Sequence, residues 1–276
     1  YEAYTYRAEE KGVLKGKTAI DYRSRLNQMR IYLDEVSTGV RCAYDFNRSF
    51  SIDFLDYLIL DKDVSAKTRN NYRTWLSTFG NWMVERLYIE KNPIEEIRML
   101  REEEKFRDPL TAEDLARLRD YTQKYNPPFY LACMMEYYCF IRPDELRYVK
   151  VGDISISEQS VYVHGEHSKN RKGQTVAIND KVLRIMIQQK VFDHPSNDYL
   201  FGQNLVPGPI QLYVNRFRVE WNKVRDALRF PKSYQFYSLK DSGIRDLANA
   251  EGIVIARDQA RHSDISVTNK YLKSAK

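Results

Sequence analysis

The chain has 276 residues, of which 43% are hydrophobic and 30% are charged, and this balance excludes a disordered protein. It carries 44 basic and 38 acidic side chains, which is a net charge of +6. The excess is uneven, because residues 1–104 hold 17 basic and 18 acidic side chains and leave 27 and 20 for the rest. The surplus in the second part indicates a polyanionic partner there.

The longest apolar run, residues 129–135, is much shorter than the ~20 residues of a membrane helix, so we expect no membrane contact. Three cysteines without disulfide or zinc spacing, and no secretory signal, favour a cytoplasmic protein. The chain begins at Tyr1 and not at methionine. We therefore expect a piece of a longer protein, with residues 1–16 as a leader or the remnant of a preceding segment.

Helical periodicity dominates the first hundred residues. Apolar residues recur at helical spacing over residues 18–33 and 50–60, and Ser65 has the character of an N-cap for a helix through residue 87. Asn92-Pro93 ends this pattern, because proline disfavours a helical residue before it. No strand pattern occurs, so we predict a helical bundle. The aromatic stripe of its longest helix, Trp75, Phe79 and Trp82, is typical of a core.

The polar run 102–107 is typical of a linker, so we predict two domains, residues 1–104 and 105–276. The second begins with Thr111 as an N-cap, followed by a buried helix over 129–141. The spacing of the apolar residues then changes from helical to alternating. This pattern predicts two antiparallel strands, 161–163 and 175–178, joined by the basic turn 164–174. Helices are expected over 142–146, 210–228, 238–250, 255–261 and 266–272. The fold class is therefore mostly α with a small antiparallel sheet, as a helical N-terminal domain and a mixed α/β domain.

The residues that could carry chemistry lie far apart in sequence and close to the ends of predicted elements: Arg142, Glu145, Lys169, Tyr237, Lys240, His262 and Tyr271. Each of these residues could instead have an ordinary structural role. Arg142 could form a simple surface ion pair with Glu145 one turn away, and most of the 21 tyrosines must be packing residues.

Two further alternatives concern the basic turn. Lys172 competes with Lys169 for any catalytic role, because turn registers are uncertain by a few residues. The spacing of His164 and His167 could suit a metal, but no third ligand lies nearby in the sequence, and we expect no metal.

The chain contains two short motifs in this order: Arg142-Pro-Asp-Glu-Leu146, and His262 followed after nine residues by Tyr271. These motifs resemble those of the tyrosine recombinases, or phage-type integrases. The resemblance covers nearly the whole chain. Residues 65–93 are similar to the helical core DNA-binding domain of that family, and residues 105–276 to its catalytic domain. Several weak motifs in the right order, on the expected elements, make a specific signal.

The resemblance implies a site-specific DNA recombinase that cuts and rejoins strands through a 3′-phosphotyrosyl intermediate, for integration or excision of a mobile element or phage. It implies that Tyr271 is the nucleophile, that Arg142 and His262 hold the phosphate, and that Lys169 is the general acid. Cleavage would need no metal or other cofactor. The implied partner is double-stranded DNA, with a homo-tetramer on DNA and a monomer or weak oligomer without it.

The chain departs from the family pattern at a few positions. Tyr237-x-x-Lys240 stands where the family usually has His-x-x-Arg, so the phosphate clamp should be weaker, since lysine lacks the bidentate fork of arginine. Asp241 follows where another histidine is frequent, and Arg261 stands where glycine usually precedes the C-terminal histidine. These changes keep two alternatives open: a catalytically weakened or inactive DNA-binding relative, and a type IB topoisomerase-like relaxer.

The DNA-binding residues that we predict are basic and lie in three segments of the chain: the helix after Ser65, the basic turn, and the helix expected over 210–228. They are Lys67, Arg69, Arg73, Arg171, Lys172, Arg216, Arg218 and Lys223. The alternative is that they form ordinary solvated faces. If they contact phosphates, DNA binding will depend strongly on salt.

Overall fold

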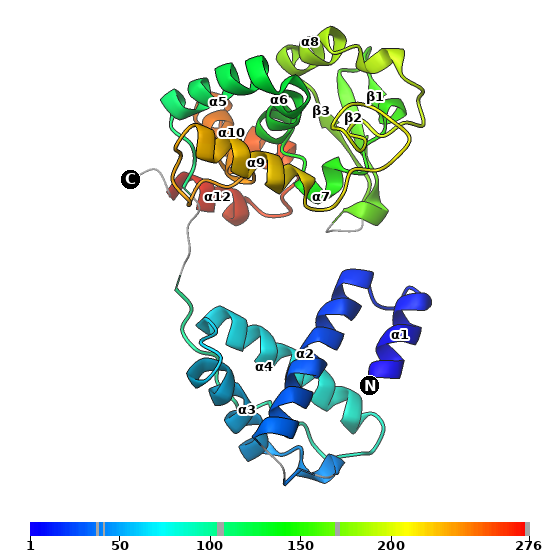
Figure 1. Cartoon of the computed structure of the whole chain (residues 1–276), viewed down its shortest axis with the longest axis vertical. Coiled ribbons are helices and arrows are strands. Elements are labelled where there is room, and N and C mark those ends of the chain that lie inside the picture. The colour runs from blue at the N-terminus through cyan, green and yellow to red at the C-terminus, as the bar shows by residue number, and fades with distance from the viewer. Residues whose placement is uncertain (37–38, 41, 104–107, 169–171, 274–276) are drawn as a thin grey trace. The chain divides into compact units, whose positions relative to one another are not determined.

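The computed structural model describes residues 1–276 apart from 37–38, 41, 104–107, 169–171 and 274–276. The chain forms two compact units, Tyr1–Lys105 and Phe106–Lys276 (Figure 1). Each unit has its own hydrophobic core. Within the described residues the fold is mostly helical with a small antiparallel sheet, which confirms the predicted fold class. None of the described helices is both long and apolar enough to cross a membrane.

The N-terminal unit contains the helices α1 (Glu2–Glu10), α2 (Gly16–Glu35), α3 (Arg48–Leu60) and α4 (Ala66–Val84). Ser65 caps α4 as predicted, because its hydroxyl oxygen accepts a hydrogen bond from the Thr68 backbone N–H at 3.3 Å. The helix ends at Val84, earlier than predicted, and Leu87 adopts a left-handed conformation with φ 59°. The sequence analysis missed α1. In the core Trp75 is buried and stacks on Phe79, with ring centroids 5.9 Å apart.

The second unit combines helices with the small sheet, which lies at one side of the unit (Figure 1). It contains α5 (Ala112–Tyr125), α6 (Pro127–Met134), α7 (Pro143–Leu146), β1 (Ile154–Ser155), β2 (Ser160–Val163), β3 (Gln174–Ala177), α8 (Asp180–Gln188), α9 (Arg216–Ala227), α10 (Ser238–Glu251), α11 (Ile253–Gln259) and α12 (Ile265–Lys273). The Thr111 cap is present, since its hydroxyl oxygen accepts from the Asp114 backbone N–H at 3.1 Å.

The strands pair in the order β1-β2-β3, antiparallel throughout, with Val161 opposite Val176 and Val163 opposite Gln174. The valines Val161, Val163 and Val176 belong to the buried core of the unit, which fixes the register of the β2–β3 hairpin. The hairpin was predicted. The two-residue strand β1 was missed, because it is too short to show an alternating pattern.

Two predicted helices of this unit were wrong in part. The helix expected from residue 210 begins at Arg216, because Gly202 and Gln211 pair as an isolated β-bridge and hold the preceding chain extended. The helix expected over 129–141 ends at Met134 and continues as a π-helical turn, Met135–Cys139. Phe140 then adopts a left-handed conformation, with φ 54°, and ends the turn. This irregular turn supports the candidate site.

Candidate active site

The π-helical turn and α10 meet through a buried lysine. Lys240, in the first turn of α10, is 0% exposed, and its Nζ donates a hydrogen bond to the Phe140 carbonyl oxygen at 2.6 Å. The left-handed conformation of Phe140 leaves this carbonyl free for such a partner. Lys240 therefore binds protein backbone in this structure and does not present its ammonium group to solvent.

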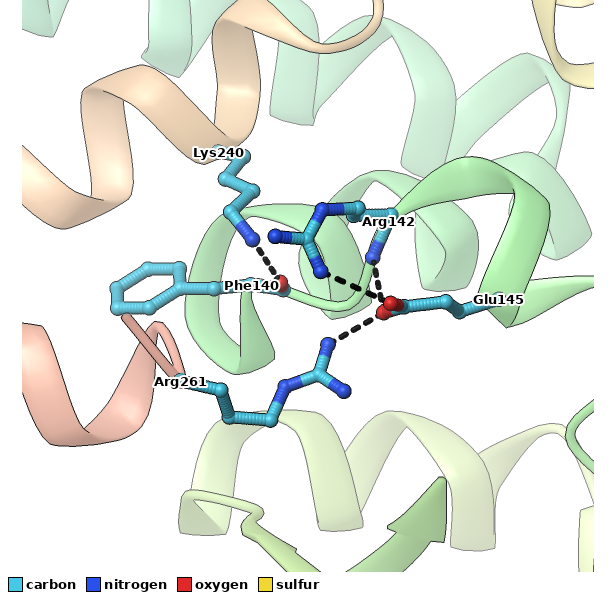
Figure 2. A network of polar contacts seen from close by, with 5 residues as sticks. All are labelled: Phe140, Arg142, Glu145, Lys240 and Arg261. Carbon is cyan, nitrogen blue, oxygen red and sulfur yellow. Dashed lines mark hydrogen bonds and ion pairs between the residues drawn. The ribbon is translucent and has the colours of Figure 1, made fainter. Parts of the chain in front are cut away.

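A carboxylate holds two arginines beside this lysine (Figure 2). Glu145 of α7 is 2% exposed at its side chain, and its Oε1 accepts from Arg142 Nη1 at 2.9 Å. Glu145 Oε2 forms an ion pair with Arg261 Nη2 and also accepts from the Arg142 backbone N–H at 3.2 Å. The Arg142–Glu145 pair was the expected one. The Arg261–Glu145 pair, between residues 116 positions apart, was not foreseen.

Arg261 occupies a backbone position that usually belongs to glycine. It follows α11 with φ 57°, and its N–H donates to the Asp258 carbonyl while the His262 N–H donates to the Arg257 carbonyl. These two hydrogen bonds define a Schellman motif, whose C′ residue is left-handed. A side chain other than glycine, asparagine or aspartate costs about 1–2 kcal/mol there. The ion pair with Glu145 offsets this cost.

Charges in this cluster shift one another's pKa. Burial alone would lower the pKa of Arg142, but the Glu145 carboxylate and a contact with the Tyr237 hydroxyl raise it above its usual value. Burial opposes ionisation of Glu145, yet Arg261 and Arg142 lower its pKa. Burial, and then the positive charge of Arg142, lower the pKa of Lys240 to about 7. The site is therefore rich in positive charge that burial leaves poorly compensated.

A second buried carboxyl group, that of Glu136, lies close to Lys240. Glu136, within the π-helical turn, is fully buried, and neither carboxyl oxygen has a hydrogen-bond partner among the described residues. Burial raises its pKa well above the usual value, and the neighbouring Lys240 charge opposes this shift. The sequence analysis did not single out Glu136, because an acid inside an apolar run gives no indication of which cation it will meet.

His262 and Tyr271 come together as the spacing predicts. Their rings stack with centroids 5.6 Å apart and planes 9° from parallel, and Tyr271 packs against the apolar cluster of Phe140 and Ile244. His262 Nδ1 lies 2.9 Å from the hydroxyl of Thr268, which is fully buried. When this hydroxyl donates to Nδ1, the imidazole N–H stands on Nε2, the nitrogen on the other side of the ring. Thr268 was missed, because threonine within a helix carries no distinctive signal.

The same positive charges act on His262 and make the stability of the fold depend on pH. Burial, followed by the charges of Lys240, Arg142 and Arg261, lowers the pKa of His262 from 6.5 to about 4. The unfolded chain therefore takes up this proton first, and the folded state should lose stability as the pH falls from about 6.5 towards 4. We expect His262→Asn to flatten this loss, measured as urea unfolding midpoints at pH 7 and pH 5. Equal losses in the native and variant proteins would contradict the assignment.

The predicted catalytic residues do not all fall within the described chain. Arg142, Tyr237, Lys240 and His262 are linked through the contacts and charge effects above, and Tyr271 joins them through His262. Lys169 and Arg171 lie outside the described residues. Lys172 is exposed just before β3. The choice between Lys169 and Lys172 as the acid stays open.

The predicted DNA-binding residues have varied settings. Arg69 Nη1 donates to the Arg98 carbonyl at 2.8 Å, and Arg73 donates through Nε to the Ile97 carbonyl at 2.9 Å. Both therefore have a structural role in the N-terminal unit that the sequence did not indicate, and Arg69 is buried. Lys67 is exposed and pairs loosely with Glu102 at 3.9 Å.

The basic residues on α9 share an acidic neighbour. Arg216 and Lys223 each contact the buried Glu220, at 3.1 and 2.9 Å, while Arg218 is exposed. DNA contact by all these basic residues stays a prediction.

The two histidines weighed as a metal pair have other partners. His164 Nε2 lies 2.7 Å from Asp153 Oδ1, and His167 stacks on Tyr148 with ring centroids 3.6 Å apart. They line an open polar pocket of about 550 Å³ beyond the C-terminal end of β2, on the turn side of the β2–β3 hairpin.

Comparison with solved structures shows that the fold is shared with known proteins. A structure of the Tn1549 transposon integrase in complex with a circular intermediate DNA has a TM-score of 0.75 and 18% identity, covering 97% of this chain and 93% of that one. A lambda integrase dimer bound to a COC′ core site has a TM-score of 0.75 and 16% identity, covering 100% and 96%.

Sequence relatives point the same way. A tyrosine recombinase of Pseudothermotoga lettingae is 25% identical over 71% of this chain and 67% of its own length. A protein of Escherichia coli (strain K12), named as a defective protein, IntQ, is 28% identical over 60% of this chain. This chain spans only 39% of the length of that relative.

The model of the phage integrase family matches residues 109–276. The chain belongs to the phage integrase family, which confirms the resemblance seen in the sequence.

Proposed function

We propose that this protein is a site-specific DNA strand transferase that cuts and rejoins DNA through a covalent bond to Tyr271. The observation that carries the proposal is the positive cluster around Glu145, with Arg142 partly open to solvent and His262 stacked on Tyr271. A cluster of preorganised donors and positive charge is what a phosphodiester needs when its oxygens gain charge in the transition state.

The reaction follows from these groups. The Tyr271 hydroxyl gives its proton to water and its oxygen attacks the phosphorus, while the bond from phosphorus to the 5′ oxygen breaks. This leaves a 3′-phosphotyrosyl link, and the departing 5′ oxygen takes a proton from the acid, for which we propose Lys169, with Lys172 as the alternative. Arg142 binds the non-bridging oxygens and His262 donates a hydrogen bond to one of them. Attack by the 5′ hydroxyl of another strand reverses each step, so that no external energy source is needed.

The biological role that we propose is integration or excision of a mobile element or phage, acting on double-stranded DNA in the cytoplasm. The fold neighbours include a transposon integrase with its circular intermediate DNA and a lambda integrase tetramer on a Holliday junction. We extend the tetramer to this protein as the state on DNA, with a monomer or weak oligomer in its absence. Phosphate contacts by Lys67, Lys172 and Arg218 would then make binding weaken steeply with salt.

The decisive experiment uses a nicked DNA substrate whose cleavage product is lost, so that the covalent adduct accumulates. The DNA must carry the chain's own recombination site, found first by selecting bound sequences from a random pool. The native protein should form an adduct that survives denaturing electrophoresis. Tyr271→Phe, which keeps the ring but removes the nucleophilic oxygen, should reduce the adduct to background. Tyr125→Phe, at an exposed tyrosine of α5, serves as the matched control and should retain it.

Each outcome separates the candidate functions. DNA binding without an adduct from the native protein would replace the proposal with a DNA-binding relative that has lost catalysis. An adduct in Tyr271→Phe would overturn the choice of nucleophile. Where an adduct forms, strand exchange between two labelled sites supports the recombinase, and relaxation of supercoils without exchange supports a type IB topoisomerase-like enzyme.

A further inference from the structure

Arg261 takes one oxygen of a carboxylate that Arg142 would otherwise bind alone. Glu145 has two oxygens and a guanidinium has a matching fork, so an isolated Arg142–Glu145 pair can close as a bidentate contact. In this structure Arg142 reaches Oε1 with Nη1, and Oε2 pairs with Arg261 Nη2 (Figure 2). The contact between Arg142 and Glu145 side chains is therefore through a single donor.

This arrangement leaves Arg142 with donors to spare. A guanidinium has five N–H donors, so donors remain for an anion after the contacts of Arg142 with Glu145 and with the Tyr237 hydroxyl. The Arg142 side chain is 22% exposed, while that of Arg261 is only 5% exposed. Of the two arginines, Arg142 is thus the one placed to touch a substrate, and Arg261 is placed to act through Glu145.

The remaining charges of the cluster support an anionic occupant. The Nε–H of Arg261 is buried and meets no acceptor among the described residues. Lys240 is 0% exposed and donates to the Phe140 carbonyl, so in this structure it acts on an anion through its charge and not through a surface contact. The two arginines that share the Glu145 carboxylate carry more positive charge than this carboxylate neutralises, and a bound phosphate would balance the remainder.

We propose that Arg261 is a positioning residue for phosphodiester cleavage, which holds Glu145 so that Arg142 keeps a free guanidinium edge for the scissile phosphate. This inference rests on the proposed function and names a residue of the same site. It also accounts for an arginine at a left-handed backbone position where glycine is the favoured residue.

The test compares Arg261→Gly and Arg261→Lys with the native protein in the nicked-substrate assay. Glycine suits φ 57°, so Arg261→Gly removes the side chain without straining the helix end. We expect its single-turnover rate of adduct formation to fall about 10–100-fold, the effect of losing a charged hydrogen bond. DNA affinity should change less than about twofold, because the Arg261 side chain is only 5% exposed and has little surface for a phosphate contact. Lysine can still donate to Glu145 and should restore part of the rate.

A neutral substrate distinguishes positioning from simple structural damage. With a methylphosphonate at the scissile position, the charge that Arg142 must neutralise is absent, so the Arg261→Gly penalty should shrink to about threefold or less. The rates are compared at a temperature at which the variant is still folded, because loss of the buried ion pair should itself lower the melting temperature. A penalty that stays the same on the neutral substrate would overturn the inference. Arg119→Ala, which removes an exposed charge on α5, controls for net charge and should keep the native rate.

The result can be told apart from failure of the proposed function. If the native protein forms no adduct, the proposed function fails and Arg261 has no cleavage to position. If the native protein forms an adduct and Arg261→Gly forms it at the same rate, the proposed function stands and this inference alone is wrong.

Discussion

Replacing Glu145 with glutamine should unfold the second unit or greatly lower its free energy of unfolding. The substitution keeps the shape of the side chain but leaves Arg142 and Arg261 facing each other without the carboxylate that holds them. Glu145 and Arg261 are almost fully buried, so water cannot solvate the arginine charge that the substitution leaves unpaired. Breaking such a buried pair lowers the free energy of unfolding by about 3–5 kcal/mol. We expect a lower urea midpoint for the Phe106–Lys276 transition and no adduct on the nicked substrate.

The matched comparison is an exposed ion pair in the same unit. Asp226 contacts Arg225 at 3.0 Å, and its side chain is 70% exposed, so Asp226→Asn should change stability by no more than about 1 kcal/mol. Glu145→Asp keeps the charge on a shorter chain and should fall between native and Glu145→Gln. If Glu145→Gln were as stable as Asp226→Asn, the two arginines would not depend on Glu145, and the account of the site given above would be wrong.

Sequence reasoning found the features that depend on neighbouring residues. The caps at Ser65 and Thr111, the β2–β3 hairpin and the i,i+3 pair of Arg142 and Glu145 all follow from residues a few positions apart. These interactions form within one or two turns, so composition and spacing are enough to indicate them. The order of the two motifs then indicated the family.

Sequence reasoning failed where the conformation of one element depends on contacts with another element far away in the sequence. The π-helical turn ends at Phe140 with its carbonyl toward Lys240, a residue 100 positions further along the chain. Nothing local shows that Lys240 will be buried, since a lysine near a helix start is usually solvated. Arg261 was noticed as a departure from glycine, but its partner could not be known before α11 was placed against α7. Long-range contacts of this kind require the packed structure.

Gly243 lies where α10 packs closely against the π-helical turn. A Cβ atom at this position would lie 1.8 Å from the Tyr137 carbonyl oxygen and 2.6 Å from Phe140 Cε1. The first contact is with backbone, which cannot rotate away as a side chain can. Glycine lowers helix stability relative to alanine by about 1 kcal/mol, so its place in the middle of α10 is explained by this approach.

Gly243→Ala should therefore destabilise the second unit despite the better helix propensity of alanine. Relief of the clash must move α10 away from the π-helical turn, and overpacking of this kind costs about 3 kcal/mol or more where backbone is the obstacle. The same movement would separate Lys240 from the Phe140 carbonyl, since Lys240 lies one turn before Gly243, so adduct formation should fall with stability. Gly208→Ala is the control, because its nearest neighbouring atom lies 4.0 Å from the added Cβ and stability should change by only about 0.5 kcal/mol. Urea unfolding and the nicked-substrate assay measure both effects, and native behaviour of Gly243→Ala would contradict the close packing on which the position of Lys240 depends.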